Sequence, residues 1–255
     1  MNLFDITAMT DLSAGNLAIL FGIVLLAGLV RGFSGFALSA MTMASAVLIL
    51  PPVELIPVCW WLEMTASVLM ARGGWAEADR RVVFGLVIGS MVGVPVGFAL
   101  TMALPVEISK LVALIVILVL AATQLARIRL AFLATKPGLY GAGLLAGIAT
   151  GIASVGGMVV ALYVLASDSP ARQMRASLVV FLLFSTVTTL ATLLWFGAMD
   201  GRTVARGLFL APAAALGVIG GKLLFTPRFE PWYRPFCLSL LMGLAGLALA
   251  RTALT

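Results

Sequence analysis

The sequence contains no histidine and only two cysteines, and charged residues make up 10% of its 255 residues. The absence of histidine removes the usual base of a serine nucleophile and the commonest metal ligand. Cys59 and Cys237 stand singly inside apolar stretches, so they form neither a Cys-x-x-Cys pair nor a thiol cluster. The sequence also lacks a P-loop motif, which would indicate nucleotide hydrolysis. We therefore expect no enzymatic activity, no bound metal and no cofactor.

Apolar residues are in excess: 62% of the chain is hydrophobic and the mean hydropathy is +1.17. A soluble domain is about 45–50% apolar and about a quarter charged, so this chain has too few polar side chains to cover a water-facing surface. The net charge is +6, but the basic residues lie at the ends of apolar runs and form no stripe with aromatic residues. This pattern indicates membrane topology rather than nucleic-acid binding. The composition predicts an all-α polytopic membrane protein without a nucleic-acid partner.

Apolar runs follow one another along the chain, at residues 16–30, 33–50, 55–71, 82–104, 108–126, 137–153, 155–167, 176–198, 207–226 and 235–250. About 20 helical residues cross the hydrocarbon core of a bilayer, so five of these runs are long enough alone and the runs at 16–30, 137–153 and 155–167 are short. The longest polar stretch, from Arg72 to Arg81, cannot hold a soluble domain. The whole chain therefore reads as membrane protein.

Glycine patterns recur in the two halves of the chain. The pairs Gly28/Gly32 and Gly93/Gly97 of the first half match, at nearly constant offset, Gly147/Gly151 and Gly217/Gly221 of the second, and Leu125-Ala126-Arg127 matches Leu249-Ala250-Arg251. We interpret these matches as an internal duplication, with one repeat at residues 1–131 and the other at 132–255, each holding five helical elements. The alternative is that glycine and alanine recur by chance, as they do in many membrane proteins.

The first two elements of each half return the chain to its starting side. Residues 16–50 would form a helix of about 50 Å if unbroken, too long for one span, so they form either a two-span hairpin or a re-entrant pair. Each half then crosses the membrane an odd number of times, and the second half is inverted. With Arg31 set aside, this scheme places Lys110, Arg202, Arg206 and Arg251 on one side, and on the other Arg72, Arg80, Arg81, Arg127, Arg129, Lys136, Arg172, Arg175, Lys222, Arg228 and Arg234.

The uneven distribution of basic residues favours this inverted scheme, with both termini outside the cytoplasm. We therefore expect two inverted repeats with broken or re-entrant helices at the repeat interface, a common plan of secondary transporters.

Two glycine-rich breaks are the candidate binding site. Glycine lets the backbone leave the helix, and the freed N–H groups at the start of a new half-helix attract anions, with help from serine hydroxyls. The alternative for the spaced glycines, Gly28/Gly32 and Gly147/Gly151, is close helix packing. The predicted substrate-binding residues are Gly32, Phe33, Ser34, Gly35 and Phe36 in the first break and Ser154, Gly156 and Gly157 in the second.

Three charged residues are candidates for coupling or gating: Glu63, Arg31 and Arg175. Glu63 lies near the middle of an apolar run, where a charge costs about 2.5–3.5 kcal/mol, so it needs a partner or a task. It could carry a proton, or it could pair with Arg31 or Arg72 and hold helices together. Arg31 and Arg175 could attract an anion by charge, and the alternative for both is an interfacial anchor whose stem extends to the membrane surface.

The Gly-x-x-x-Gly-Phe-Ser-Gly-Phe element at 28–36, the glycine-rich element at 147–157 and the duplicated halves resemble the sulfite exporter family often called TauE/SafE, over nearly the whole chain. This resemblance implies a multi-pass permease of the bacterial inner membrane. It also implies export of a small sulfur oxyanion or an organosulfonate, such as sulfite or sulfoacetate. The residues themselves favour an anion, whereas the sulfur chemistry and the direction come from the resemblance.

These observations together predict a secondary transporter that works by alternating access. The anion would bind between the two breaks, and Glu63 or the membrane potential would couple its movement. The expected partners are a small anion, membrane lipid and a coupled proton, and the sequence is compatible with an oligomer. A passive anion channel and a non-transporting membrane scaffold are the alternatives.

Overall fold

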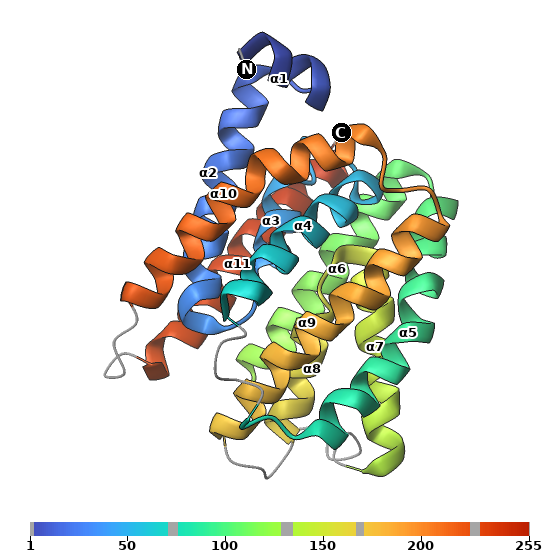
Figure 1. Cartoon of the computed structure of the whole chain (residues 1–255), viewed down its shortest axis with the longest axis vertical. Coiled ribbons are helices and arrows are strands. Elements are labelled where there is room, and N and C mark those ends of the chain that lie inside the picture. Colours follow the sequence, from blue (N-terminus) through green and yellow to red (C-terminus); the bar gives the residue numbers. More distant parts are fainter. Residues whose placement is uncertain (1–2, 71–75, 129–134, 167–170, 225–229, 255) are drawn as a thin grey trace.

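The computed structural model describes residues 3–70, 76–128, 135–166, 171–224 and 230–254. These residues form helices and their connections, with no strand among them (Figure 1). The helices are α1 (Leu3–Thr10), α2 (Ala14–Ser34), α3 (Leu38–Ala46), α4 (Pro52–Met70), α5 (Arg80–Ala103), α6 (Val106–Leu125), α7 (Lys136–Ala153), α8 (Gly156–Ala166), α9 (Ala171–Trp195), α10 (Gly201–Leu224) and α11 (Glu230–Leu254).

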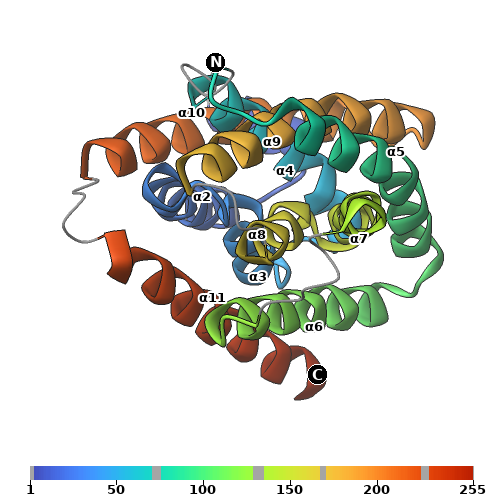
Figure 2. The same ribbon diagram turned by 90° about the horizontal axis from the view of Figure 1, so that it is seen from below.

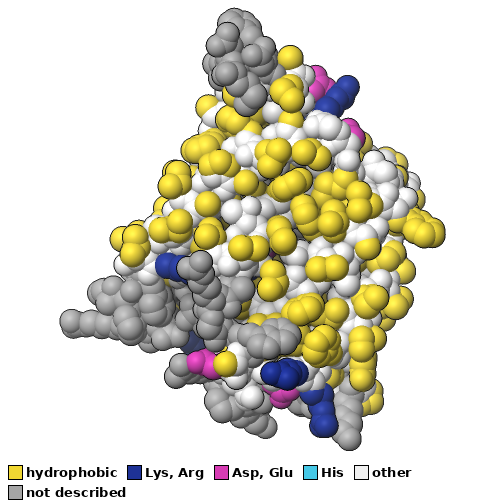
Figure 3. All heavy atoms as spheres, viewed as in Figure 1, with side chains coloured by type: hydrophobic (Ala, Val, Ile, Leu, Met, Phe, Trp, Pro, Cys, Tyr) yellow, Lys and Arg dark blue, Asp and Glu magenta, His cyan; other side chains and the backbone are white. Residues whose placement is uncertain are grey.

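Seven of the described helices are long and apolar enough to cross a membrane: α2, α4, α5, α6, α9, α10 and α11. The α7 helix adds a shorter apolar segment, Pro137–Ala153, and α3 and α8 are shorter again. Hydrophobic side chains cover the middle of the surface, and the visible charged side chains gather toward its two ends (Figure 3). The protein is therefore an all-α polytopic membrane protein, as the composition predicts.

The first two apolar runs differ from the helices that they form. The run that was expected to end at residue 30 continues as α2 to Ser34, because Arg31 lies inside the protein with 1% of its surface exposed. A buried and paired arginine does not end a membrane helix, whereas the sequence pattern treats every charge as a boundary. The following run, 33–50, begins with the last two residues of α2 and holds one further helix, the nine residues of α3.

The short helices α3 and α8 lie in the middle of the bundle. Viewed from below, α10, α9 and α5 line one side of them, and α11 and α6 line the opposite side (Figure 2). The α2 helix packs against α3, and α7 packs against α8, so each short helix stays beside the longer helix that precedes it. The two interrupted pairs, α2–α3 and α7–α8, therefore form the interior of the protein.

Glycines bring α2 and α10 into close contact. A Cβ atom on Gly28 would lie 3.1 Å from the Cα atom of Gly217, and one on Gly32 would lie 2.8 Å from the Cα atom of Gly221. Both contacts are too short for a side chain, so the two backbones touch. The residue numbers rise together along the contact, which means that α2 and α10 run in the same direction.

The same arrangement joins α5 and α7. A Cβ atom on Gly93 would lie 2.9 Å from the Cα atom of Gly147, and Gly151 packs against the backbone of Gly97. The Thr101 hydroxyl also donates a 2.9 Å hydrogen bond to the Gly151 carbonyl. The alternative interpretation of the spaced glycines as helix-packing positions is thus confirmed for both pairs, in the small-residue manner of membrane helices.

Polar groups fix the ends of the long helices. Asp79 caps α5, Thr135 caps α7 and Asp200 accepts a 2.8 Å bond from the Thr203 N–H near the start of α10. Such side chains satisfy N–H groups that the first helical turn leaves without partners. These three side chains fix the residues at which α5, α7 and α10 begin.

The α10 helix is also tied to α4 at both ends. Arg206 forms an ion pair with Glu54 near the start of α4 and donates to the Thr10 carbonyl at 2.8 Å. At the other end, Lys222 donates a 2.6 Å hydrogen bond to the Leu69 carbonyl. The α4 and α10 helices therefore run in the same direction along their whole contact.

Candidate anion-binding site

The first interruption lies between α2 and α3, at Gly35–Ala37. Gly35 and Ala37 have φ angles of 81° and 79°, in the left-handed region that reverses the direction of the backbone. The Ser34 hydroxyl donates to the Phe36 carbonyl at 2.7 Å, and Arg31 Nη1 donates to the Gly35 carbonyl at 2.8 Å. The sequence analysis placed this break at residues 32–36, but Gly32 remains helical because it packs against α10.

The second interruption lies between α7 and α8, at Ser154–Val155. Ser154 has a φ angle of 58° and ends α7, and α8 begins at Gly156. A Cβ atom on Gly156 would collide with the Thr150 hydroxyl and would lie 2.5 Å from the Ala146 carbonyl oxygen, so only glycine fits this turn. The break occupies only a small part of the glycine-rich element at 147–157, because Gly151 packs against α5 and stays in the helix.

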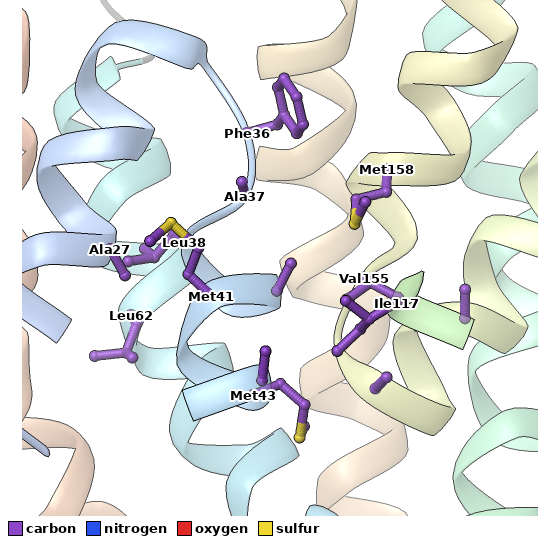
Figure 4. Close-up of a cluster of buried hydrophobic side chains, with 14 of the residues drawn as sticks. Ala27, Phe36, Ala37, Leu38, Met41, Met43, Leu62, Ile117, Val155 and Met158 are labelled. Carbon is purple, nitrogen blue, oxygen red and sulfur yellow. The ribbon is translucent and has the colours of Figure 1, made fainter. Parts of the chain in front are cut away.

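The two interruptions face one cavity of about 40 Å³. A space of this size holds a few water molecules or a small solute. Figure 4 shows Phe36 and Ala37 of the first break across from Val155 of the second break and from Met158 in α8. The lining residues are Arg31, Phe36, Ala37, Ser39, Ala40, Trp60, Glu63, Thr150, Ser154, Val155, Gly156, Gly157, Met158, Leu182, Ser185, Thr186 and Thr189.

A buried ion pair lies at the wall of this cavity. Arg31 Nη2 lies 3.1 Å from Glu63 Oε2, and 16% of the Glu63 side chain remains exposed. The Ser39 N–H and hydroxyl both donate to Glu63 Oε1, at 3.3 and 2.9 Å. Of the two partners that the sequence suggests for Glu63, the structure shows Arg31; Arg72, the other candidate, lies outside the described residues. The role of Glu63 in proton transfer stays a prediction.

Side chains of α9 with hydroxyl groups also line the cavity. Ser185, Thr186 and Thr189 line the cavity and are nearly buried. The Trp60 indole N–H donates to the Thr186 carbonyl at 2.7 Å, which ties α9 to α4. The sequence analysis missed these hydroxyls. Their signal is the cluster of hydroxyl residues at 185–189 inside an apolar run, where Ser185 and Thr189 share one helix face.

The structure brings part of the predicted site together. The predicted residues that line the cavity are Phe36, Ser154, Gly156, Gly157, Arg31 and Glu63. The other members of the first break do not line it: Gly32, Phe33, Ser34 and Gly35. The side chain of Arg175 lies outside the described residues, although its backbone belongs to α9.

The cavity is suited to an anion on electrostatic grounds. The α8 helix starts at its wall, so the first N–H groups of that helix and the positive end of its dipole lie beside the space. Arg31 adds a buried cation with up to five donors, and the α9 hydroxyls add further donors. Donors from several helices can therefore surround a small oxyanion in this cavity.

Comparison with known proteins agrees with this arrangement. The family model described as sulfite exporter TauE/SafE matches residues 20–249 of the chain. A search of curated proteins and a search of solved structures each returned no match. The matched family consists of membrane permeases, usually of the bacterial inner membrane. The chain belongs to the TauE/SafE sulfite exporter family of multi-pass membrane transporters of sulfur anions.

Proposed function

We propose that this protein is a secondary transporter that exports a small sulfur oxyanion or organosulfonate, such as sulfite or sulfoacetate, by alternating access. The observation that carries the proposal is one central cavity lined by both helix breaks and by the buried Arg31. A site at the centre of the protein, between interrupted helices, is where secondary transporters hold their substrates.

In this proposal the two halves, residues 1–131 and 132–255, act as inverted repeats. With the short α1 set aside, each half contributes five helices, α2 to α6 and α7 to α11. Their reciprocal packing supports it: α2 pairs with α10 through glycines, and α7 pairs with α5 in the same way. In each case the first helix of one half contacts the fourth helix of the other. With this reciprocal packing, the two halves can exchange conformations. The exchange would open the cavity to one side of the membrane and then to the other.

The anion binds between the breaks in this proposal. The N–H groups at Gly156 and Gly157, the Ser154 hydroxyl and the Arg31 guanidinium are the nearest donors in the cavity wall. Ser34 holds the first break in shape through its bond to the Phe36 carbonyl, and its direct contact with the substrate stays a prediction. The attraction of anions by Arg175 also stays a prediction.

In this proposal, Glu63 couples the movement of the anion to the movement of a proton. It is the acidic residue among the described residues of the cavity wall, and it contacts the cation that would meet the substrate. A change in its protonation changes the charge beside the anion. Movement of the anion would therefore depend on the proton gradient.

Sulfite flux in proteoliposomes tests the proposal. Purified protein should release sulfite with saturable kinetics, and unlabelled sulfite on the opposite side should accelerate the exchange of labelled sulfite, because a carrier returns faster when loaded. Flux without saturation and without such acceleration would support a passive channel instead. An absence of sulfite flux would contradict the proposal.

Matched variants locate the site in the same assay. Ser154→Ala removes a hydroxyl at the cavity wall, whereas Ser13→Ala removes a hydroxyl that caps α2 away from the cavity. Flux should fall at least several-fold in the first variant and stay close to the parent protein in the second. Equal flux in Ser154→Ala, and in Ser34→Ala combined with it, would place the anion away from these hydroxyls, whereas an absence of flux in the parent protein would favour a non-transporting scaffold.

A further inference from the structure

The charge balance of the cavity bears on which anions it accepts. Arg31 and Glu63 are the charged residues among its described lining residues, and their ion pair leaves the wall without net charge. Cys59, on the same helix as Glu63, is fully buried beside it, and its thiol is the other titratable group there. Without a net charge, the wall offers a bare anion only its dipoles and its N–H and hydroxyl donors to offset the loss of hydration.

Within the described part of the chain, no ion pair joins another charged group to Arg31 or Glu63. The α10 helix meets α4 through Arg206 at Glu54 and through Lys222 at Leu69, toward the two ends of α4 rather than at Glu63. On α6, Glu107 and Lys110 pair with each other in the first turns. From α3 the neighbour of Glu63 is the hydroxyl and N–H of Ser39, and α9 presents hydroxyls.

The two oxygens of Glu63 have different surroundings. Oε1 accepts both bonds from Ser39, whereas Oε2 faces the Arg31 guanidinium and accepts no hydrogen bond of good geometry. A proton on Oε2 would neutralise the carboxyl and leave the bonds to Oε1 in place. The released Arg31 would then give the cavity a single positive charge.

We infer that this site, on the basis of the proposed transport function, loads one proton on Glu63 together with one singly charged small oxyanion, so that the loaded cavity is electrically neutral. A dianion of the same shape would leave one uncompensated negative charge in a region of low dielectric constant, which is strongly unfavourable. The substrate class of the site is therefore the monoanion, such as hydrogen sulfite or a simple monosulfonate. Sulfate and dianionic sulfonates are excluded by charge. Of the two substrates named in the proposed function, this inference keeps sulfite, in its hydrogen sulfite form, and removes sulfoacetate, whose sulfonate and carboxylate together carry two charges.

The inference is tested by measuring how many protons, and how much net charge, cross the membrane with each sulfite ion. Purified protein in proteoliposomes would carry a pH-sensitive dye inside, with the membrane potential set by a potassium gradient and valinomycin. Sulfite flux should move protons in the same direction as the anion, and its rate should change little when the potential is reversed. Flux that follows the potential without proton movement would overturn the inference and leave the proposed transport intact, whereas no flux would remove both.

Competition separates charge from shape. Methanesulfonate and sulfate are both tetrahedral and similar in size, but the first carries one charge and the second carries two. Methanesulfonate should inhibit sulfite flux at a concentration at least about tenfold lower than sulfate, since about 1.4 kcal/mol of discrimination gives that ratio. Equal inhibition by the two ions, or inhibition by neither, would contradict selection by charge.

A pair of variants on one helix completes the test. Glu63→Gln keeps an oxygen for the Ser39 bonds but cannot release a proton, whereas Glu54→Gln changes a glutamate that pairs with Arg206 outside the cavity. Methanesulfonate, unlike hydrogen sulfite, has no proton to release near neutral pH. Its binding by Glu63→Gln should persist and lose its dependence on pH, and the proton movement that accompanies its flux should disappear. Glu54→Gln should retain both. Unchanged coupling in Glu63→Gln would overturn the inference even if that variant transports slowly.

Discussion

Arg31 on α2 and Glu63 on α4 form an ion pair in the interior of the protein, with Nη2 and Oε2 3.1 Å apart. The pair lies at the wall of the cavity that both helix breaks line, and Arg31 also bonds to the Gly35 carbonyl in the first break. A single contact therefore connects the charge in the cavity, the shape of the first break and the packing of α2 on α4.

Removal of one partner of this pair should destabilise the protein strongly. Glu63→Ala leaves a buried guanidinium without its counter-ion, and we expect the free energy of unfolding to fall by about 3–5 kcal/mol. The combination of Arg31→Met with Glu63→Met should be less destabilised than Glu63→Ala, because no charge remains buried, but it should transport no sulfite. Thermal unfolding in detergent and sulfite flux measure the two effects; a double variant less stable than Glu63→Ala would contradict this account.

The glycine contact between α2 and α10 should tolerate no side chain. In Gly217→Ala the new methyl group would lie against the Leu25 carbonyl and 2.8 Å from the Cα atom of Gly28, so the two helices must separate. The matched control is Gly243→Ala in α11, where nothing lies within 4 Å and alanine favours the helix by up to about 1 kcal/mol. The unfolding temperature should fall in the first variant and not in the second, and a fall of equal size in both would argue against the close contact.

Asp200 should stabilise the start of α10 in a pH-dependent way. The N–H and hydroxyl of Thr203 hold the pKa of this carboxyl below its ordinary value of 3.8. Because the pKa is lower in the folded state, the stabilisation is fully present above the unfolded pKa and is lost as the pH falls through the folded pKa. Asp200→Ala should cost about 1 kcal/mol at neutral pH and less in acid. Thermal unfolding of both proteins over this pH range measures the difference, and a penalty that does not change with pH would contradict it.

The α9 hydroxyls should contribute to substrate binding. Thr189→Val keeps the shape of a side chain at the cavity wall and removes its donor, and a hydrogen bond to a charged group is worth about 1.5–3 kcal/mol. The concentration of sulfite at half-maximal flux should therefore rise about tenfold or more. Thr188→Val, on the same helix but outside this cavity, is the control and should leave it unchanged. Equal values for the two variants would place the anion away from α9.

Much of the fold is predictable because membrane helices leave strong signals. Length and hydropathy identify most of the spans, and the repeated glycine pairs identify the helices that pack most closely. The ends of the interrupted helices are harder to predict. Gly32 and Gly151 look like helix breakers in the sequence, yet each is helical because a partner helix lies against it. Tertiary contact, which one sequence does not display, decides whether a glycine bends a helix or packs it.

The site was partly predictable for a related reason. A charge inside an apolar run is conspicuous, so Glu63 and Arg31 stand out, and their pairing follows from the cost of burial. Ser185, Thr186 and Thr189 are not conspicuous, because serine and threonine can bond to the carbonyls of their own helix and are common in membrane spans. Only the orientation of α9 in the folded protein shows that these three side chains line the cavity.

The most direct test of the central claim is a crystal structure of the protein soaked with selenite, an analogue of sulfite whose selenium atom gives an anomalous signal. The proposed function predicts one selenium peak in the cavity between the two breaks. The selenite oxygens should lie within hydrogen-bond reach of Arg31 and of the first N–H groups of α8. A cavity without selenium, in crystals where selenite occupies another part of the protein, would contradict it.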